Sequence, residues 1–174
     1  MNKEFLQSLR EQIKSGTVTE QEPMSRHTSF SIGGPADVFV QPATKEEIKN
    51  AIFCAKEAGV PFFVMGNGSI LLVSDEGFRG MIIQIGKNFQ EISVQDTVIE
   101  VQAGALLSRT ARAAWNAGLT GFEFAAGIPG TTGGAVAMNA GAYGGEIKDV
   151  LLDAQVLTQD GEFLTLTAEE LELS

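Results

Sequence analysis

Apolar positions near the start of the chain recur at the spacing of an amphipathic helix. The residues that set this spacing are Phe5, Leu6, Leu9 and Ile13. Their period predicts a helix from Asn2 to Ser15. A polar stretch from Gly16 to Glu22 follows. It has no apolar period and predicts a connector.

Beyond the connector, short apolar runs alternate with helical patterns. The runs predict strands at 37–41, 61–65 and 81–85, and hairpins at 91–94 with 98–102 and at 150–158 with 162–166. A capping box at Thr44–Glu47 predicts a helix that ends at Gly59, and a second helix is predicted from Ala105 to Ala117, closed by Gly118. This alternation indicates an α+β or α/β fold.

The last residues carry another helix-start signal. Thr167 and Glu170 form a capping-box pattern only four residues before Ser174. Four residues are too few for a helix to bury a face. The sequence therefore predicts that the chain ends inside an element, as a fragment would.

Composition and charge restrict the function classes. The chain has 174 residues, 44% hydrophobic and 20% charged, which is typical of one globular domain or two small lobes. No apolar run approaches the ~20 residues that span a bilayer, and the polar start lacks a signal core, so a cytoplasmic location is expected. A net charge of −10 argues against nucleic-acid and anionic-membrane partners. One His and one Cys exclude a metal-ligand cluster, so no metal site is predicted.

Two glycine-rich segments stand out as candidate binding loops. The first is Met65–Ser69, directly after an apolar run. The second is Ala125–Gly145, with 13 Gly or Ala among 21 residues and no charged side chain. Such segments expose backbone N–H groups that suit an anion such as a pyrophosphate. The alternatives are a simple turn for the first segment and a tightly packed Gly/Ala helix hairpin for the second. Neither segment matches a P-loop or a Rossmann fingerprint.

Most of the individual residues that could take part in chemistry are expected to have structural roles. His27, beside Thr and Ser, is expected to be a structural hydrogen-bonding group, and Cys54 a small core residue. Tyr143 and Asn139, inside the second glycine-rich segment, are candidate ligand contacts. Packing and turn formation are the alternatives for these two. No residue is predicted to be catalytic.

Three stretches resemble the UDP-N-acetylenolpyruvoylglucosamine reductase family of flavoenzymes. They are SRHTSFSIGGPADVFVQP (25–42), GNGSILLVSDEGFRG (66–80) and GFEFAAGIPGTTGGAVAMNAGAYGGEIKDV (121–150). The resemblance runs from Glu22 to the end. It implies an α+β, two-lobed FAD-binding domain of the vanillyl-alcohol-oxidase (PCMH) type. The implied organisation is a helix and connector at 1–22, one lobe at 23–85 and a second, truncated lobe at 86–174.

The resemblance also implies the cofactor site, with the pyrophosphate on the first glycine loop and the flavin along the second segment. The implied cofactor-binding residues are Gly66, Asn67, Gly68, Ser69, Ile70, Leu71, Gly127, Ile128, Pro129, Gly130, Gly133, Gly134, Ala137 and Gly141. Asn139 and Tyr143, chosen for their own chemistry and not from the resemblance, are the predicted contacts to the substrate, with the flavin as the alternative. Because the 66–72 loop has no His or Cys, FAD is expected to be non-covalent.

The family reaction uses NADPH to reduce FAD, which then reduces the enolpyruvyl group of a nucleotide sugar. The family's catalytic Arg, Ser and Glu match no residue here, so these 174 residues alone are expected to be inactive. Other interpretations fit as well: a non-catalytic FAD- or nucleotide-binding fragment, an engineered fragment that binds nothing tightly, or another flavin oxidoreductase on the same scaffold. Oligomeric state is not predicted.

One position departs from the family pattern. The family loop reads GxGSNLL, and this chain has Ile70 where the family has Asn. If that amide contacts FAD, its loss costs about 1–3 kcal/mol, or roughly ten- to a hundredfold in affinity. Weakened FAD binding is therefore a hypothesis for this chain.

Overall fold

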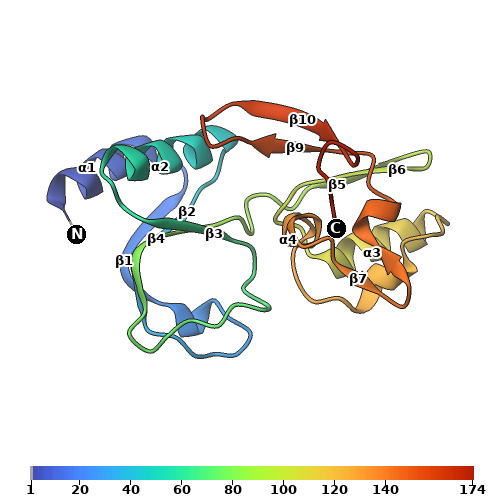
Figure 1. Cartoon of the computed structure of the whole chain (residues 1–174), viewed down its shortest axis with the longest axis horizontal. Coiled ribbons are helices and arrows are strands. Elements are labelled where there is room, and N and C mark those ends of the chain that lie inside the picture. The colour runs from blue at the N-terminus through green and yellow to red at the C-terminus, as the bar shows by residue number, and fades with distance from the viewer. Residues whose placement is uncertain (1) are drawn as a thin grey trace. The chain divides into compact units, whose positions relative to one another are not determined.

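The computed structural model describes residues 2–174. Contacts divide the chain into two compact units, Met1–Asn88 and Phe89–Ser174 (Figure 1). The predicted lobe boundary lies at 85/86, and the N-terminal helix is part of the first unit's core. Among the described residues, no helix combines the length and the apolar character that crossing a bilayer requires.

A four-stranded sheet forms the centre of the first unit. Its strands are β1 (Thr17–Pro23), β2 (Pro35–Gln41), β3 (Phe62–Met65) and β4 (Phe78–Gln84), in the order β1-β2-β4-β3. β4 runs parallel to both β2 and β3, and β1 is antiparallel to β2. The predicted strands are confirmed, with β2 and β4 starting earlier than expected.

Strand β1 replaces the predicted connector at 16–22, so that prediction was wrong. The sequence TVTEQEP has no apolar alternation, and most of its side chains are exposed. β1 is an edge strand, stabilised by backbone pairing from Thr17 opposite Gln41 to Pro23 opposite Pro35. Backbone pairing depends little on side-chain type, so a polar edge strand leaves almost no sequence signal.

Two helices pack on one face of this sheet. α1 (Lys3–Gln12) is capped by the Asn2 side chain, and α2 (Lys45–Glu57) by the Thr44 hydroxyl, which accepts from the Glu47 N–H at 3.1 Å. Both predicted helices are confirmed, although α1 ends three residues earlier than expected. Their apolar faces join the strands in a buried cluster that comprises Phe5, Leu6, Leu9, Ile13, Val38, Val40, Ala51, Cys54, Ala55, Met81 and Ile83.

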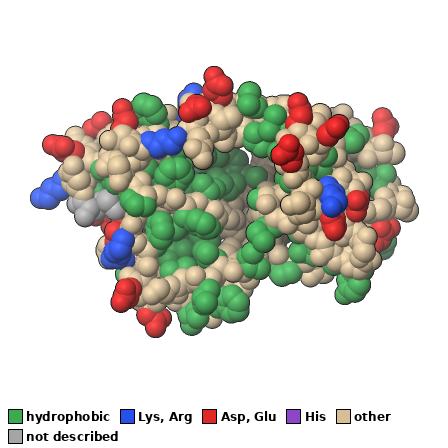
Figure 2. Space-filling model, in the orientation of Figure 1, with side chains coloured by type: hydrophobic (Ala, Val, Ile, Leu, Met, Phe, Trp, Pro, Cys, Tyr) green, Lys and Arg blue, Asp and Glu red, His purple; other side chains and the backbone are tan. Residues whose placement is uncertain are grey.

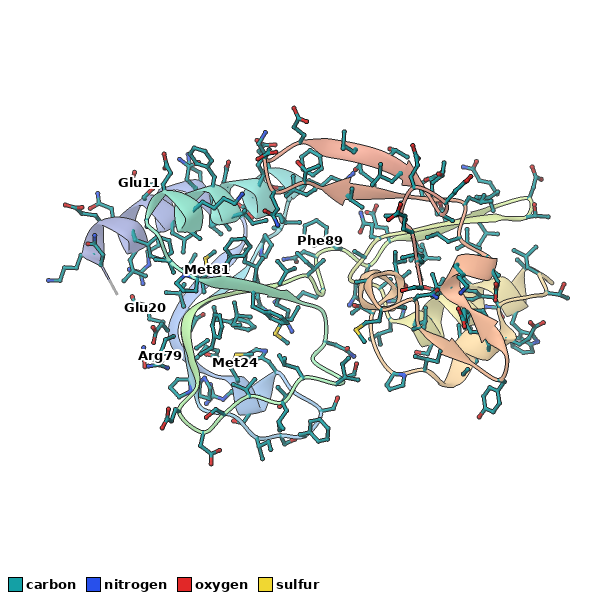
Figure 3. All side chains as sticks on the ribbon, in the orientation of Figure 1. Glu11, Glu20, Met24, Arg79, Met81 and Phe89 are labelled. Carbon is teal, nitrogen blue, oxygen red and sulfur yellow. The ribbon has the colours of Figure 1, made fainter. Side chains whose placement is uncertain are left out.

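The opposite face of the sheet is covered by loops and one short 3-10 helix. A second buried cluster there contains Met24, Ala36, Phe39, Met65 and Ile82. Met24 lies in the short 3-10 helix η1 (Met24–Arg26). Figure 3 shows Met81 on the helix side of the strands and Met24 on the loop side. The candidate loop after β3 belongs to this second side, because Leu71 packs against the same cluster.

The second unit is built from short elements around α3. They are β5 (Ile92–Gln95), β6 (Val98–Val101), α3 (Leu107–Asn116), η2 (Glu123–Gly127), α4 (Thr132–Ala137), β7 (Gly141–Ala142), β8 (Gly145–Glu146), η3 (Ile147–Asp149), β9 (Asp153–Leu157) and β10 (Phe163–Thr167). Its strands pair as three two-stranded antiparallel sheets. Both predicted hairpins and the predicted helix before Gly118 are confirmed.

The buried core of this unit comes partly from the glycine-rich tract itself. Leu107 and Ala111 of α3 pack with Phe124, Ala125, Ala135 and Ile147. Near the C-terminus, Thr167 and Glu170 make both hydrogen bonds of a capping box. The Glu170 carboxylate accepts from the Thr167 N–H at 2.9 Å, and the Glu170 N–H donates to the Thr167 hydroxyl at 3.3 Å. A turn follows there, and no helix.

Candidate functional site

The loop after β3 is held by the segment that follows η1. Gly68 is buried with φ +66°, and a Cβ at this position would lie 2.1 Å from the carbonyl oxygen of His27. The Gly68 carbonyl accepts from the N–H groups of Ser29 (3.2 Å) and Leu71 (3.4 Å). Only glycine combines this φ with such a close approach. The shape of the loop is therefore fixed by a chain segment about forty residues earlier.

The outer part of this loop is open to a ligand. Asn67 is exposed and makes no hydrogen bond to any residue from 2 to 174. Ile70 is exposed as well, and Gly66 is half-buried with its carbonyl accepting from the Gln84 side chain at 3.2 Å. An unengaged backbone N–H on an exposed glycine-rich turn is the kind of donor that binds phosphate oxygens.

Apolar side chains accompany this loop. Ile70 and Leu72 are exposed, and so are Phe30 and Ile32 on the supporting segment. Hydrophobic side chains also gather on the visible face of the first unit in Figure 2. Exposed apolar groups beside unengaged backbone donors suit a ligand that has both an anionic and a flat apolar part.

In the second unit, some predicted site glycines are required by close packing against the protein, and others face open space. A Cβ on Gly133 would lie 2.7 Å from the Ala103 Cβ, and one on Gly141 2.8 Å from the Glu146 Cγ. These two glycines allow protein groups to pack closely. Gly127 differs, because it has no positive φ and no protein atom within 4 Å of its added Cβ. The protein's own packing does not require glycine there, which leaves the surface open for a ligand.

The amides at the start of α4 are already engaged. The Thr132 N–H donates to Ala105 at 2.8 Å, the Gly133 N–H to Ala103 at 2.8 Å, and the Gly134 N–H to the Thr131 hydroxyl at 3.3 Å. The sequence suggests that this helix start offers bare donors to an anion, but these three donors are used inside the unit. Gly133 and Gly134 can therefore contribute surface, and not N–H donors, to a ligand.

The remaining predicted cofactor contacts surround these glycines. Pro129 and Ala137 are exposed, and Ile128 is half-buried against the core of the unit. Gly130 has φ +138°, and its carbonyl accepts from the Leu107 N–H at 3.0 Å. This bond ties the segment to the start of α3. The segment is thus fixed by core packing on one side and exposed on the other.

Asn139 is held inside the protein. It is 8% exposed with φ +41°; its amide donates to Glu146 at 2.8 Å, and its side-chain oxygen accepts from the Lys148 N–H at 3.0 Å. The hydrogen bonds from Lys148 and Asn139 lower the pKa of Glu146 below its ordinary value. Asn139 therefore closes the 139–148 turn, and its role as a substrate contact stays a prediction.

Tyr143 has the opposite environment. It is 98% exposed and has φ +55°, an unusual conformation for an aromatic residue. Its side chain lines a shallow depression of about 470 Å³ together with Glu123, Phe124 and nearby glycines. The predicted substrate contact at Tyr143 also stays a prediction, and its side chain is free to meet a ligand.

Sequence reasoning did not identify the segment that supports the first loop. Residues 27–34 contact this loop and its continuation through the Ser29 bond to Gly68 and the Gly34 N–H bond to Ser74 at 2.8 Å. The signal was the Gly33–Gly34 pair: a Cβ on Gly34 would lie 2.0 Å from the Asp75 carbonyl oxygen. A residue larger than glycine could not pack against the loop at Gly34. This requirement becomes visible only once the fold is known.

Comparisons with known proteins identify the family. The family model described as FAD binding domain matches residues 36–167. UDP-N-acetylenolpyruvoylglucosamine reductase from Agathobacter rectalis is 50% identical over 100% of this chain and 59% of its own length. The same enzyme from Alkaliphilus metalliredigens is 54% identical over 88% of this chain and 50% of its own. The chain thus spans about half the length of the curated relatives it matches.

Solved structures agree with this family. A crystal structure of UDP-N-acetylenolpyruvylglucosamine reductase from Thermus caldophilus is 37% identical, covers 89% of this chain and 54% of that one, and has a TM-score of 0.74. A chitooligosaccharide oxidase is 20% identical, covers 95% of this chain and 37% of that one, with a TM-score of 0.69, and shows the shared fold alone. The predicted α+β fold of the vanillyl-alcohol-oxidase (PCMH) type is confirmed. The chain belongs to the FAD binding domain family, and within it is similar to the segment found in UDP-N-acetylenolpyruvoylglucosamine reductases.

Proposed function

We propose that this chain binds FAD non-covalently through Gly66–Leu71 in the first unit and Gly127–Gly141 in the second. The observation that carries the proposal is the open surface at these glycines, with Asn67 unengaged and nothing facing Gly127. In an acidic chain with net charge −10, an anionic cofactor is best held by local backbone donors, because the overall field repels it. The 66–72 loop contains neither His nor Cys, which supports non-covalent attachment.

For the whole protein we propose the reductase activity that the relatives' names carry. FAD, when bound, supplies the hydride carrier between NADPH and the enolpyruvyl double bond of the nucleotide sugar, which yields UDP-N-acetylmuramate for peptidoglycan synthesis in the cytoplasm. The residues of this chain hold and orient the cofactor. The exposed Tyr143 side chain is proposed to contact the substrate, with Asn139 shaping the turn beneath it. Nucleic acid and membrane are not proposed as partners.

Flavin retention tests the cofactor proposal. Purified protein incubated with FAD and passed through a desalting column is expected to keep a flavin absorbance spectrum. Heat denaturation is expected to release all of that flavin, since no covalent bond holds it. A chain that comes off the column colourless at micromolar FAD would contradict the proposal.

A steady-state assay tests the role within the reductase. We expect no NADPH oxidation by these 174 residues with UDP-N-acetylenolpyruvoylglucosamine, because the family's Arg, Ser and Glu match no residue of this sequence. These residues would then bind the cofactor without turnover. Substrate-dependent turnover by this chain alone would show that the catalytic groups lie within it.

The substitution Ile70→Asn is expected to raise FAD affinity roughly ten- to a hundredfold. Ile70 is 66% exposed on the first loop, and an amide there adds a donor and an acceptor where the chain now presents an alkyl group. The measurement is the quenching of flavin fluorescence on titration of each protein into FAD. Phe53→Asn, at a similarly exposed apolar position on α2 outside the proposed site, controls for a general effect of polarity. Equal affinities for Ile70→Asn and the unmodified chain would refute the hypothesis.

A further inference from the structure

His27 is fixed by two separate contacts in the first unit. Its ring stacks on Phe39, with ring centroids 4.1 Å apart and an interplanar angle of 29°. Its Nε2 lies 3.0 Å from a Glu22 carboxylate oxygen, and the two side chains are 18% and 16% exposed. Arg26 pairs with the same Glu22 oxygen at 3.6 Å. A stacked ring with a hydrogen bond at its far end has little freedom to move.

The backbone of His27 is in direct contact with the candidate FAD loop. Its carbonyl oxygen occupies the space where a Gly68 side chain would begin, and two residues later Ser29 donates to the Gly68 carbonyl. The Thr28 hydroxyl donates to the Ile32 carbonyl at 2.9 Å and closes the intervening turn. Residues 27–29 therefore pack directly against the loop and support it.

We infer that His27 is a positioning residue for the FAD loop. Its anchored side chain fixes the His27 carbonyl, and this carbonyl in turn fixes Gly68 and the exposed backbone of Gly66 and Asn67. Without the His27 side chain, residues 27–29 no longer hold the loop in place. The loop then samples conformations in which its N–H groups point in different directions. The inference rests on the proposed FAD site for its functional consequence, but the ordering of the loop is a property of the protein alone.

A purely structural His27 would stabilise the whole unit equally. A positioning His27 acts on one loop, so its loss is expected to speed local opening far more than global unfolding. The amide protons of Ser29 and Leu71 report this directly, because both donate to the Gly68 carbonyl. Their hydrogen exchange can be measured without any cofactor.

The test compares His27→Ala with a rescue variant and a control. In His27→Ala, exchange at Ser29 and Leu71 is expected to accelerate about tenfold relative to core amides of β2 and β4. His27→Gln keeps a side-chain donor for Glu22 and is expected to restore most of this protection. Ile83→Val removes a methylene from the buried cluster on the other face of the sheet, and is expected to leave the ratio of loop to core exchange unchanged.

FAD affinity provides the second readout. His27→Ala is expected to weaken FAD binding about tenfold, with His27→Gln close to the unmodified chain and Ile83→Val unchanged. Unaltered exchange at Ser29 and Leu71 in His27→Ala, or the same acceleration in Ile83→Val, would overturn the inference. Failure of the unmodified chain to bind FAD would instead overturn the proposed function, while the exchange measurement still decides whether His27 orders the loop.

Discussion

Gly68→Ala is expected to lower FAD affinity more than a hundredfold. The added methyl group would meet the His27 carbonyl oxygen at 2.1 Å, a separation that no Cβ tolerates, and the residue also has φ +66°. The backbone strain alone costs about 1–2 kcal/mol. The clash adds to this cost and forces the loop away from residues 27–29, so its N–H groups lose their arrangement. Flavin fluorescence titration measures the affinity.

Gly59→Ala is the matched control for this variant. Gly59 has nearly the same backbone conformation, φ +63°, but no protein atom lies within 4 Å of its added Cβ. It follows α2 and is not part of the proposed site. We expect a stability loss of about 1 kcal/mol and unchanged FAD affinity. Similar FAD affinities in the two variants would contradict the account of the Gly68 contact.

Glu47→Ala is expected to destabilise the first unit by about 3–5 kcal/mol, a large part of a typical domain's stability. The Glu47 carboxylate is buried and accepts four backbone N–H groups: Lys14 at 2.9 Å, Ser15 at 2.7 Å and Gly16 at 3.3 Å on one oxygen, and Ala43 at 2.7 Å on the other. It thereby joins the turn after α1 to the start of α2. Removing it leaves these donors without an acceptor. Urea denaturation measures the loss.

The neighbouring Glu46→Ala serves as the control. Glu46 is exposed in the same first turn of α2, so its replacement is expected to change stability by no more than about 0.5 kcal/mol. Equal unfolding midpoints for the two variants would show that the Glu47 bonds contribute nothing beyond a surface charge.

Glu47 also predicts how stability depends on pH. Burial raises the pKa of this carboxyl, but the four backbone N–H donors lower it, and the net pKa lies below the ordinary value. Because the pKa of Glu47 is lowered in the folded state, its ionised carboxylate stabilises the fold. This stabilisation is complete above the unfolded-state pKa of about 4.3 and is lost as the pH falls below that value. The unmodified chain is therefore expected to lose stability below that pH more steeply than Glu47→Gln. Parallel pH profiles would contradict this assignment.

Elements with an apolar period could be predicted from the sequence, and polar elements could not. The helices over α1 and α2, and strands such as 37–41, follow from side chains that must be buried. Strand β1 has almost no such side chains and exists because β2 offers an unpaired edge. That edge is a product of the assembled sheet, so no local pattern in residues 17–23 could reveal it.

The two glycine segments were recognisable, but the roles of individual residues within them were not. Gly68 is required because His27 approaches it, and Gly133 because Ala103 does, and both partners lie about thirty or more residues away in the sequence. Gly127, with no such neighbour, cannot be distinguished from these by composition. Asn139 looks like a ligand contact in the sequence, and only the fold shows that Glu146 and Lys148 already engage it.

The most direct test of the central claim is a titration of isotope-labelled protein with FAD, followed by backbone amide NMR. The claim is that the exposed backbone of residues 66–71 and the open surface of residues 127–141 hold the cofactor. It predicts that the largest shifts occur at amides within 66–71 and 127–141, with those of the β9–β10 hairpin unchanged. Binding of FAD with no shift in either segment would contradict the claim.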